Sequence, residues 1–167
     1  MNKKQTNKLT IYAMLIALTV ALSLTVIIPV PATNGFVTLC DVGIYLAALL
    51  FGPIGGLTVG AFSGGLIDLL SGYPEWAIFS LLIHGLQGFI VGYIANKPMK
   101  YSRLLALFLG SLTMIVGYVF AGSLLFSWPT GIASIPGNVI QTGFGSLVTV
   151  PLFNALTRAL PKLQNKI

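Results

Sequence analysis

The feature that most constrains this chain is the placement of its basic residues. The nine lysines and arginines form three groups of three, separated by long apolar stretches that contain neither residue. The groups are Lys3, Lys4 and Lys8; Lys97, Lys100 and Arg103; and Arg158, Lys162 and Lys166. A membrane-spanning helix needs about 20 apolar residues, and basic residues gather on the cytoplasmic side. The pattern therefore predicts an integral membrane protein with all three groups in the cytoplasm.

The overall composition agrees with a membrane location. Only 7% of the residues are charged and the mean hydropathy is +0.93, whereas a soluble domain carries about 25% charged residues. The net charge of +6 does not indicate nucleic-acid binding, because the basic residues cluster at predicted membrane boundaries. The first apolar run, residues 9–28, is longer than a signal-peptide core of about 7–15 residues. We therefore expect a multi-pass protein of the cell membrane.

The number of spans follows from the same three groups. Groups on one side of a membrane are separated by an even number of spans, and residues 9–96 have room for four helices while 104–157 have room for two. We expect a single all-α membrane domain of six transmembrane helices with both termini cytoplasmic. The predicted spans are 9–28, 38–51, 54–71, 75–95, 103–126 and 134–158, joined by segments rich in proline and glycine. Span 38–51 is short, so it is either tilted or begins in a lipid-shielded loop.

Small residues at every fourth position mark packing faces in two of these spans. Gly56, Gly60, Gly64 and Asp68 share one face of span 54–71, and His84, Gly88 and Gly92 share one face of span 75–95. Such faces let helices approach closely in lipid. A charge facing the hydrocarbon costs about 2.5–3.5 kcal/mol, so Asp68 is expected to face the bundle interior or a wet cavity.

Polar side chains near the outer ends of the helices predict a small-molecule pocket, because a few convergent polar groups in an apolar wall are typical of such sites. The candidates are Asn34, Phe36, Asp68, Glu75, His84, Gln87, Trp128, Asn138 and Gln141. Structural roles stay open for some of these positions. Asp68 can bond neighbouring backbone, His84 can link helices, and Trp128 can anchor at the membrane interface. Asp41 follows Thr38 by three residues and fits a capping box at the start of span 38–51.

Motifs of catalysis are not found in the sequence. It has no Walker A, G-x-S-x-G or H-E-x-x-H motif, and its single cysteine, Cys40, excludes an internal disulfide. One histidine and three carboxylates on separate spans offer no metal-ligand spacing. We therefore expect neither enzymatic activity nor a metal or cofactor in this chain. A binding subunit that draws its energy from partners fits better.

Two stretches carry a resemblance to a known family. Residues Asp41 to Leu70, DVGIYLAALLFGPIGGLTVGAFSGGLIDLL, and the four-spaced alanines Ala13, Ala17 and Ala21 resemble substrate-binding S components of energy-coupling factor (ECF) vitamin transporters, in the riboflavin-transporter-like branch. The resemblance implies a vitamin site in the outer half, under the first outer loop, in the plasma membrane of a bacterium. It also implies a transmembrane T component that contacts the alanine ridge and two ATPases that use ATP. Without the resemblance, the spacing of the alanines alone favours internal packing of that ridge.

The nature of the vitamin follows from the predicted outer half, which holds no lysine or arginine. A site without cations disfavours vitamins that carry carboxylates. Hydroxymethylpyrimidine, pyridoxine and riboflavin all fit, and the chain looks closest to the hydroxymethylpyrimidine/pyridoxine type. We expect Trp128 or Phe36 to stack on the ring and Asn138 and Gln141 to bind its hydroxyls. Asp68, Glu75 or His84 would bind a ring nitrogen or amine.

Three other functions are weighed against this interpretation. A stand-alone facilitator would carry substrate in liposomes without any partner. A membrane enzyme would use Asp68 and His84, which lie on different predicted helices and at different depths. A homo-oligomeric channel would need polar stripes that continue through the membrane, whereas these stripes close at one end.

Overall fold

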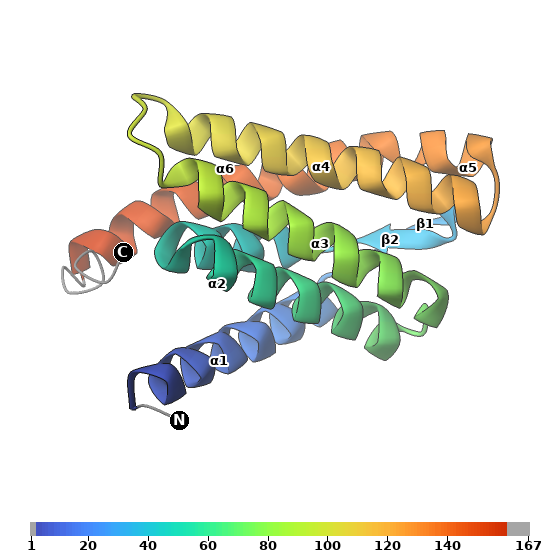
Figure 1. Ribbon diagram of the computed structural model, residues 1–167. Helices are drawn as coiled ribbons and strands as arrows, with labels where there is room; N and C mark the ends of the chain where they lie inside the picture. Colours follow the sequence, from blue (N-terminus) through green and yellow to red (C-terminus); the bar gives the residue numbers. More distant parts are fainter. Residues whose placement is uncertain (1–2, 160–167) are drawn as a thin grey trace.

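The structure, a computed structural model, describes residues 3–159 and consists of helices lying side by side with a small β-hairpin at one end (Figure 1). The helices are α1 (Lys3–Thr25), α2 (Cys40–Ser71), α3 (Pro74–Ala95), α4 (Ser102–Leu125), α5 (Trp128–Ala133) and α6 (Ile135–Ala159). Strands β1 (Ile28–Val30) and β2 (Gly35–Val37) pair antiparallel around the 3-10 turn η1 (Pro31–Thr33). The predicted helical architecture is confirmed, with the addition of the hairpin and of short α5 in the predicted outer joints.

The helices are those of a membrane protein. Five of them within the described residues are long and apolar enough to cross a bilayer. Their outward faces carry large apolar side chains, such as Met14, Phe108 and Leu147, that are 67%, 65% and 76% exposed. A protein in water rarely exposes continuous apolar surface of this kind, so these faces contact lipid.

The two helices predicted at residues 38–51 and 54–71 are present as the two segments of α2, which meet at a kink. Gly52 interrupts α2 with φ 70° and ψ −162°, and Pro53 follows it. A methyl group built on Gly56 would lie 2.8 Å from Cβ of Ala48, although residues eight apart in a straight helix are about 12 Å apart. The two segments of α2 therefore fold back on each other as a helical hairpin. The first segment, residues 40–51, is about 18 Å long, which is less than the hydrocarbon core of about 30 Å. The count of six spans therefore stays a prediction.

Basic residues gather at one end of the helices. The start of α1, the connection from α3 to α4 and the end of α6 lie at the left of Figure 1. We call this the basic end; it carries Lys8, Lys97, Lys100, Arg103 and Arg158, while Lys162 and Lys166 lie outside the described residues. The opposite end, with the β-hairpin and α5, we call the pocket end. The common end agrees with the predicted even number of spans between basic groups, and its cytoplasmic location stays a prediction.

Helices α2 and α3 touch along a seam of glycines. A methyl group on Gly56 would overlap the backbone carbonyl of Gly88, and one on Gly88 would overlap that of Gly56. One on Gly92 would overlap Gly52, and one on Gly64 would lie 2.8 Å from the carbonyl oxygen of Ser80. Backbones at this separation leave no room for a side chain, which confirms the predicted packing role of the four-spaced small residues. The seam fixes the face of α3 that carries Ser80 and His84 toward α2.

The hairpin is attached to α3 at the pocket end. The indole Nε1 of Trp76 donates a hydrogen bond of 3.0 Å to the backbone oxygen of Asn34. Asn34 has φ 50°, a left-handed conformation that asparagine tolerates better than most residues. The rings of Phe36 and Tyr73 meet edge to face with their centres 4.8 Å apart. These contacts hold the hairpin over the helix ends.

Candidate functional site

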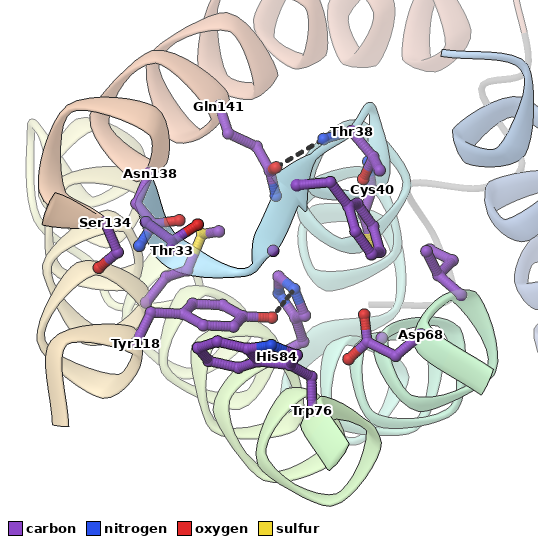
Figure 2. Close-up of a pocket in the computed structure, with 15 residues that line it drawn as sticks. Thr33, Thr38, Cys40, Asp68, Trp76, His84, Tyr118, Ser134, Asn138 and Gln141 are labelled. Carbon is purple, nitrogen blue, oxygen red and sulfur yellow. Dashed lines mark hydrogen bonds between the residues drawn. The ribbon is translucent and has the colours of Figure 1, made fainter. Parts of the chain in front are cut away.

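A cavity opens at the pocket end between the hairpin and the helices (Figure 2). Its empty space is about 540 Å³ when the open mouth is included, and about 50 Å³ of it can hold the centre of a water-sized molecule. The lining comes from five parts of the chain: Thr33, Gly35, Phe36 and Thr38; Cys40, Gly64, Ile67 and Asp68; Trp76 and His84; Met114 and Tyr118; and Ser134, Asn138 and Gln141. A pocket built from segments so far apart in sequence requires the folded bundle.

Aromatic rings form much of the wall. Trp76 is only 5% exposed, and its ring centre lies 5.8 Å from that of Tyr118. Phe36 adds a third ring from the hairpin. Flat apolar faces of this kind suit a flat ring in the ligand.

Two buried polar atoms in the lining have no hydrogen-bond partner. They are Oδ2 of Asp68 and Nδ2 of Asn138. The other unpartnered buried side-chain atoms among the described residues are hydroxyls of Ser23, Ser63 and Ser71, which do not line the cavity. An unpaired buried polar group costs about 1–3 kcal/mol. A bound molecule that offers a donor to Asp68 and an acceptor to Asn138 would remove both penalties.

A second carboxylate, Asp41, lies behind the pocket and is fully paired. Its Oδ1 accepts a hydrogen bond from Nε2 of Gln87, and its Oδ2 accepts one of 2.6 Å from Nε2 of Gln141. Gln141 also accepts, at Oε1, a 2.7 Å bond from the backbone N–H of Thr38 (Figure 2). Asp41 thus joins α2 to α3 and α6, and through Gln141 to the end of the hairpin.

The Gln87 side of this cluster continues to the pocket wall. Oε1 of Gln87 lies 2.7 Å from Nδ1 of His84, and Nε2 of His84 lies 3.1 Å from the hydroxyl of Tyr118. That hydroxyl lies 2.6 Å from Oγ of Ser80. We call Ser80, Tyr118, His84, Gln87 and Asp41 the polar chain. It connects a pocket-lining phenol to a carboxylate outside the lining.

The structure brings together five of the predicted site residues in the pocket lining: Phe36, Asp68, His84, Asn138 and Gln141. Gln87 is fully buried behind His84 and does not line the cavity. Three candidates lie outside the lining. Asn34 contributes its backbone oxygen to Trp76, Glu75 is exposed, and Trp128 is 64% exposed at the start of α5.

Sequence reasoning missed Asp41, Trp76 and Tyr118. The capping interpretation is wrong for Asp41, because its oxygens accept from Gln87 and Gln141 while the backbone N–H of Thr38 donates to Gln141. The hydroxyl of Thr38 does accept a bond of 3.2 Å from the backbone N–H of Cys40 at the start of α2. Trp76 directly follows Glu75, whose charge makes it the more conspicuous candidate in the sequence. For Tyr118, a usable signal is present: Ser111, Met114 and Tyr118 recur at helical spacing on one face of an otherwise apolar span.

The alanine ridge is available for contact. Ala13, Ala17 and Ala21 are exposed on α1, whereas Tyr12, Thr19, Val20 and Ser23 of the same helix are buried against the bundle. Internal packing, which spacing alone favoured, is therefore wrong for this ridge. Among the residues that the structure describes, no three His, Cys, Asp or Glu side chains are placed to hold a metal ion.

The sequence matches the family described as “ECF-type riboflavin transporter, S component” over residues 3–158, a range that includes every pocket residue. A relative from Lactococcus lactis subsp. cremoris (strain MG1363), named “Thiamine precursor transporter HmpT”, is 36% identical over 159 residues, 95% of this chain and 92% of the relative. An “Uncharacterized protein in gap 3'region” from Pyrococcus woesei is 37% identical over 122 residues, 72% of this chain and 82% of the relative.

Proposed function

Because the chain belongs to the family of ECF-type riboflavin transporter S components, we propose that it captures an amino-substituted pyrimidine, a vitamin precursor, at the pocket end. It is a membrane transport protein rather than an enzyme. Pyridoxine is the second candidate ligand and riboflavin the third. The basic end would face the cytoplasm of a bacterial cell and the pocket end the outside.

The observation that carries the proposal is the pair of unpartnered atoms in the pocket. Oδ2 of Asp68 accepts, and Nδ2 of Asn138 donates. Hydroxymethylpyrimidine offers an exocyclic amine as donor and a ring nitrogen or hydroxyl as acceptor, on a flat ring that suits Trp76, Tyr118 and Phe36. The name of the Lactococcus relative, a thiamine precursor transporter, favours the same class of ligand.

Binding to the isolated subunit tests the ligand. The purified chain in detergent would be titrated with hydroxymethylpyrimidine, pyridoxine, riboflavin, thiamine and pantothenate, with binding followed by native mass spectrometry. We expect hydroxymethylpyrimidine to bind most tightly. Equal or absent binding of all five would contradict the proposal, and uptake by liposomes that hold the chain alone would favour the facilitator alternative.

Partners are the second part of the proposal. We propose that the exposed ridge of Ala13, Ala17 and Ala21 contacts a T component, which joins the chain to two ATPases that supply the energy of transport. The chain itself would need no cofactor. Small side chains allow a partner helix to approach closely in lipid, which is what such a contact requires.

Substitution of the ridge tests the partners. Ala13→Trp with Ala17→Trp should abolish uptake in cells and leave ligand binding to the isolated subunit intact. Leu147→Trp, at a 76% exposed lipid-facing position on α6, is the matched control and should leave both unchanged. Loss of binding together with uptake in the alanine variant would count against a partner surface.

A further inference from the structure

We propose that Asp41, which does not line the pocket, determines the hydrogen-bonding polarity of the pocket wall by fixing the tautomer of His84. Asp41 is thus a positioning residue that acts through Gln87. The part of this inference that concerns ligands rests on the proposed function, whereas the part that concerns the tautomer does not.

The argument begins with the chemistry of the carboxylate. Each oxygen of Asp41 accepts a hydrogen bond from a glutamine, so both glutamines present their NH₂ groups to it. Gln87 reaches Oδ1 and Gln141 reaches Oδ2. The amide of Gln87 is thereby oriented with its oxygen toward His84, at 2.7 Å from Nδ1. Since that oxygen can only accept, Nδ1 carries the proton.

The direction of the remaining bonds follows along the polar chain. In the neutral ring with Nδ1 protonated, Nε2 is an acceptor, so the Tyr118 hydroxyl at 3.1 Å donates to it. Oγ of Ser80 lies 2.6 Å from that hydroxyl and also contacts Asp68; because the phenol proton already goes to Nε2, the Ser80 hydroxyl donates to Tyr118 and not to Asp68. The Tyr118 hydroxyl therefore has no further proton to donate. Toward a ligand it can act as an acceptor, as Asp68 does, and both favour a ligand edge that carries N–H groups.

The substitution Asp41→Asn should change the tautomer of His84, because Gln141, which binds the second oxygen of Asp41, cannot turn. In Asp41→Asn, one carboxylate oxygen becomes an NH₂ group, and one of the two glutamines has to turn its oxygen toward it. Gln141 is held by the backbone N–H of Thr38, which donates to its Oε1 and has no alternative orientation. Gln87 instead faces an imidazole, which changes tautomer readily. Gln87 is therefore the side chain that turns.

A turned Gln87 reverses every bond beyond it. Its NH₂ group would face Nδ1, the proton of His84 would move to Nε2, and Nε2–H would donate to the Tyr118 oxygen. The phenol would then donate to Oγ of Ser80, and the Ser80 hydroxyl would turn its proton to Asp68, which it also contacts. The wall would lose acceptor capacity at Asp68, with no change in any residue that lines the pocket.

The tautomer can be read directly, because His84 is the only histidine of the chain. The full chain, purified without a polyhistidine tag and labelled with ¹⁵N-histidine, would be examined by NMR in lipid nanodiscs at a pH where the ring is neutral. Protonated and unprotonated ring nitrogens resonate far apart, and each is assigned to Nδ1 or Nε2 by its couplings. We expect Nδ1–H in the wild type and Nε2–H in Asp41→Asn.

Two controls separate this effect from a general disturbance. Glu75→Gln makes the same change of carboxylate to amide at an exposed position outside the pocket, and Gln141→Leu removes a partner from Asp41 while leaving the Gln87 arm in place. Both should keep Nδ1–H. Should Asp41→Asn not accumulate as folded protein, Gln87→Met carries the test, and it should lose the preference for Nδ1–H.

Ligand selectivity gives the second measurement. Hydroxymethylpyrimidine would be compared with its analogue in which the exocyclic amine is replaced by an oxo group. We expect Asp41→Asn to shift the ratio of the two affinities by roughly 10-fold or more toward the oxo analogue, about the effect of one buried hydrogen bond made or lost. Nδ1–H persisting in Asp41→Asn would overturn the inference. A changed tautomer in a chain that binds neither pyrimidine would instead refute the proposed ligand and leave the positioning role standing.

Discussion

Asp41 and Asp68 are buried to a similar extent but differ in their hydrogen-bond partners. Both carboxylates belong to α2 and are 1% and 6% exposed, so burial alone does not distinguish them. Asp41 has each oxygen paired with a glutamine amide, whereas Oδ2 of Asp68 has no partner and faces the cavity. We call a carboxylate saturated when both oxygens have hydrogen-bond partners and unsaturated when one has none. The saturated carboxylate Asp41 links helices, and the unsaturated carboxylate Asp68 is available to a ligand. The pairing of individual atoms, and not burial, separates the two roles.

The largest effect is expected from removing the saturated carboxylate. Asp41→Ala leaves the amide of Gln141 without an acceptor, at about 1–3 kcal/mol, and leaves that of Gln87 with the Tyr45 hydroxyl at 2.9 Å as its acceptor, so the free energy of unfolding should fall by about 2 kcal/mol or more. Denaturation of the purified chain in detergent measures this fall. A loss below about 1 kcal/mol would mean that water or another side chain takes over, and the contrast with Asp68 would lose its basis.

Removing the unsaturated carboxylate, Asp68, should weaken ligand binding without lowering the stability of the chain. In Asp68→Ala the ligand loses a hydrogen bond to a buried carboxyl group, worth about 1–3 kcal/mol, so affinity for hydroxymethylpyrimidine should fall by roughly 10- to 100-fold. The free energy of unfolding of the ligand-free chain should stay the same or rise. Titration calorimetry and denaturation on the same preparation measure both quantities, and a large loss of stability would place Asp68 with Asp41.

Nδ2 of Asn138, the other unpartnered atom of the pocket, should contribute less to binding than Asp68. Asn138→Ala removes a neutral donor worth about 0.5–1.5 kcal/mol, so affinity should fall by only roughly 3- to 10-fold. The variant Asn138→Asp replaces that donor with an acceptor and should bind more weakly than Asn138→Ala. The same titration measures both, and unchanged affinity in both would remove Asn138 from the site.

The smallest effect is expected at the third carboxylate. Glu75 is exposed and lies outside the pocket lining. Glu75→Gln should change the free energy of unfolding and of ligand binding by no more than about 0.5 kcal/mol, as is usual for surface substitutions. A larger change in binding would show that Glu75 approaches the ligand in the bound state.

The long helices were predictable because patterns along the sequence determine their positions. Apolar length and the grouping of basic residues predict helix bounds that match α3, α4 and α6 to within a residue or two. The hairpin was not predicted, since β1 and β2 are three residues each and depend on α3 for support. A joint near Gly52 was predicted from its glycine and proline, but the local sequence does not indicate how closely the two segments of α2 fold back on each other.

The site was predictable where a polar residue interrupts an apolar span. Asp68, His84, Asn138 and Gln141 stand out in this way, and all four line the cavity. Asp41 did not, because its local context, three residues after Thr38, offers a sufficient explanation of its own. Its two partners, Gln87 and Gln141, are 46 and 100 residues away along the chain. No local pattern contains that information.

The mutual contact of Gly56 and Gly88 constrains how this sequence can vary over time. Each position already holds the smallest residue, and a methyl group on either would overlap the backbone of the other. Enlarging one can therefore never be offset by shrinking its neighbour. The two positions should lose variation without ever changing together. Methods that infer contacts from correlated substitutions would consequently be blind to this pair, although the two backbones touch.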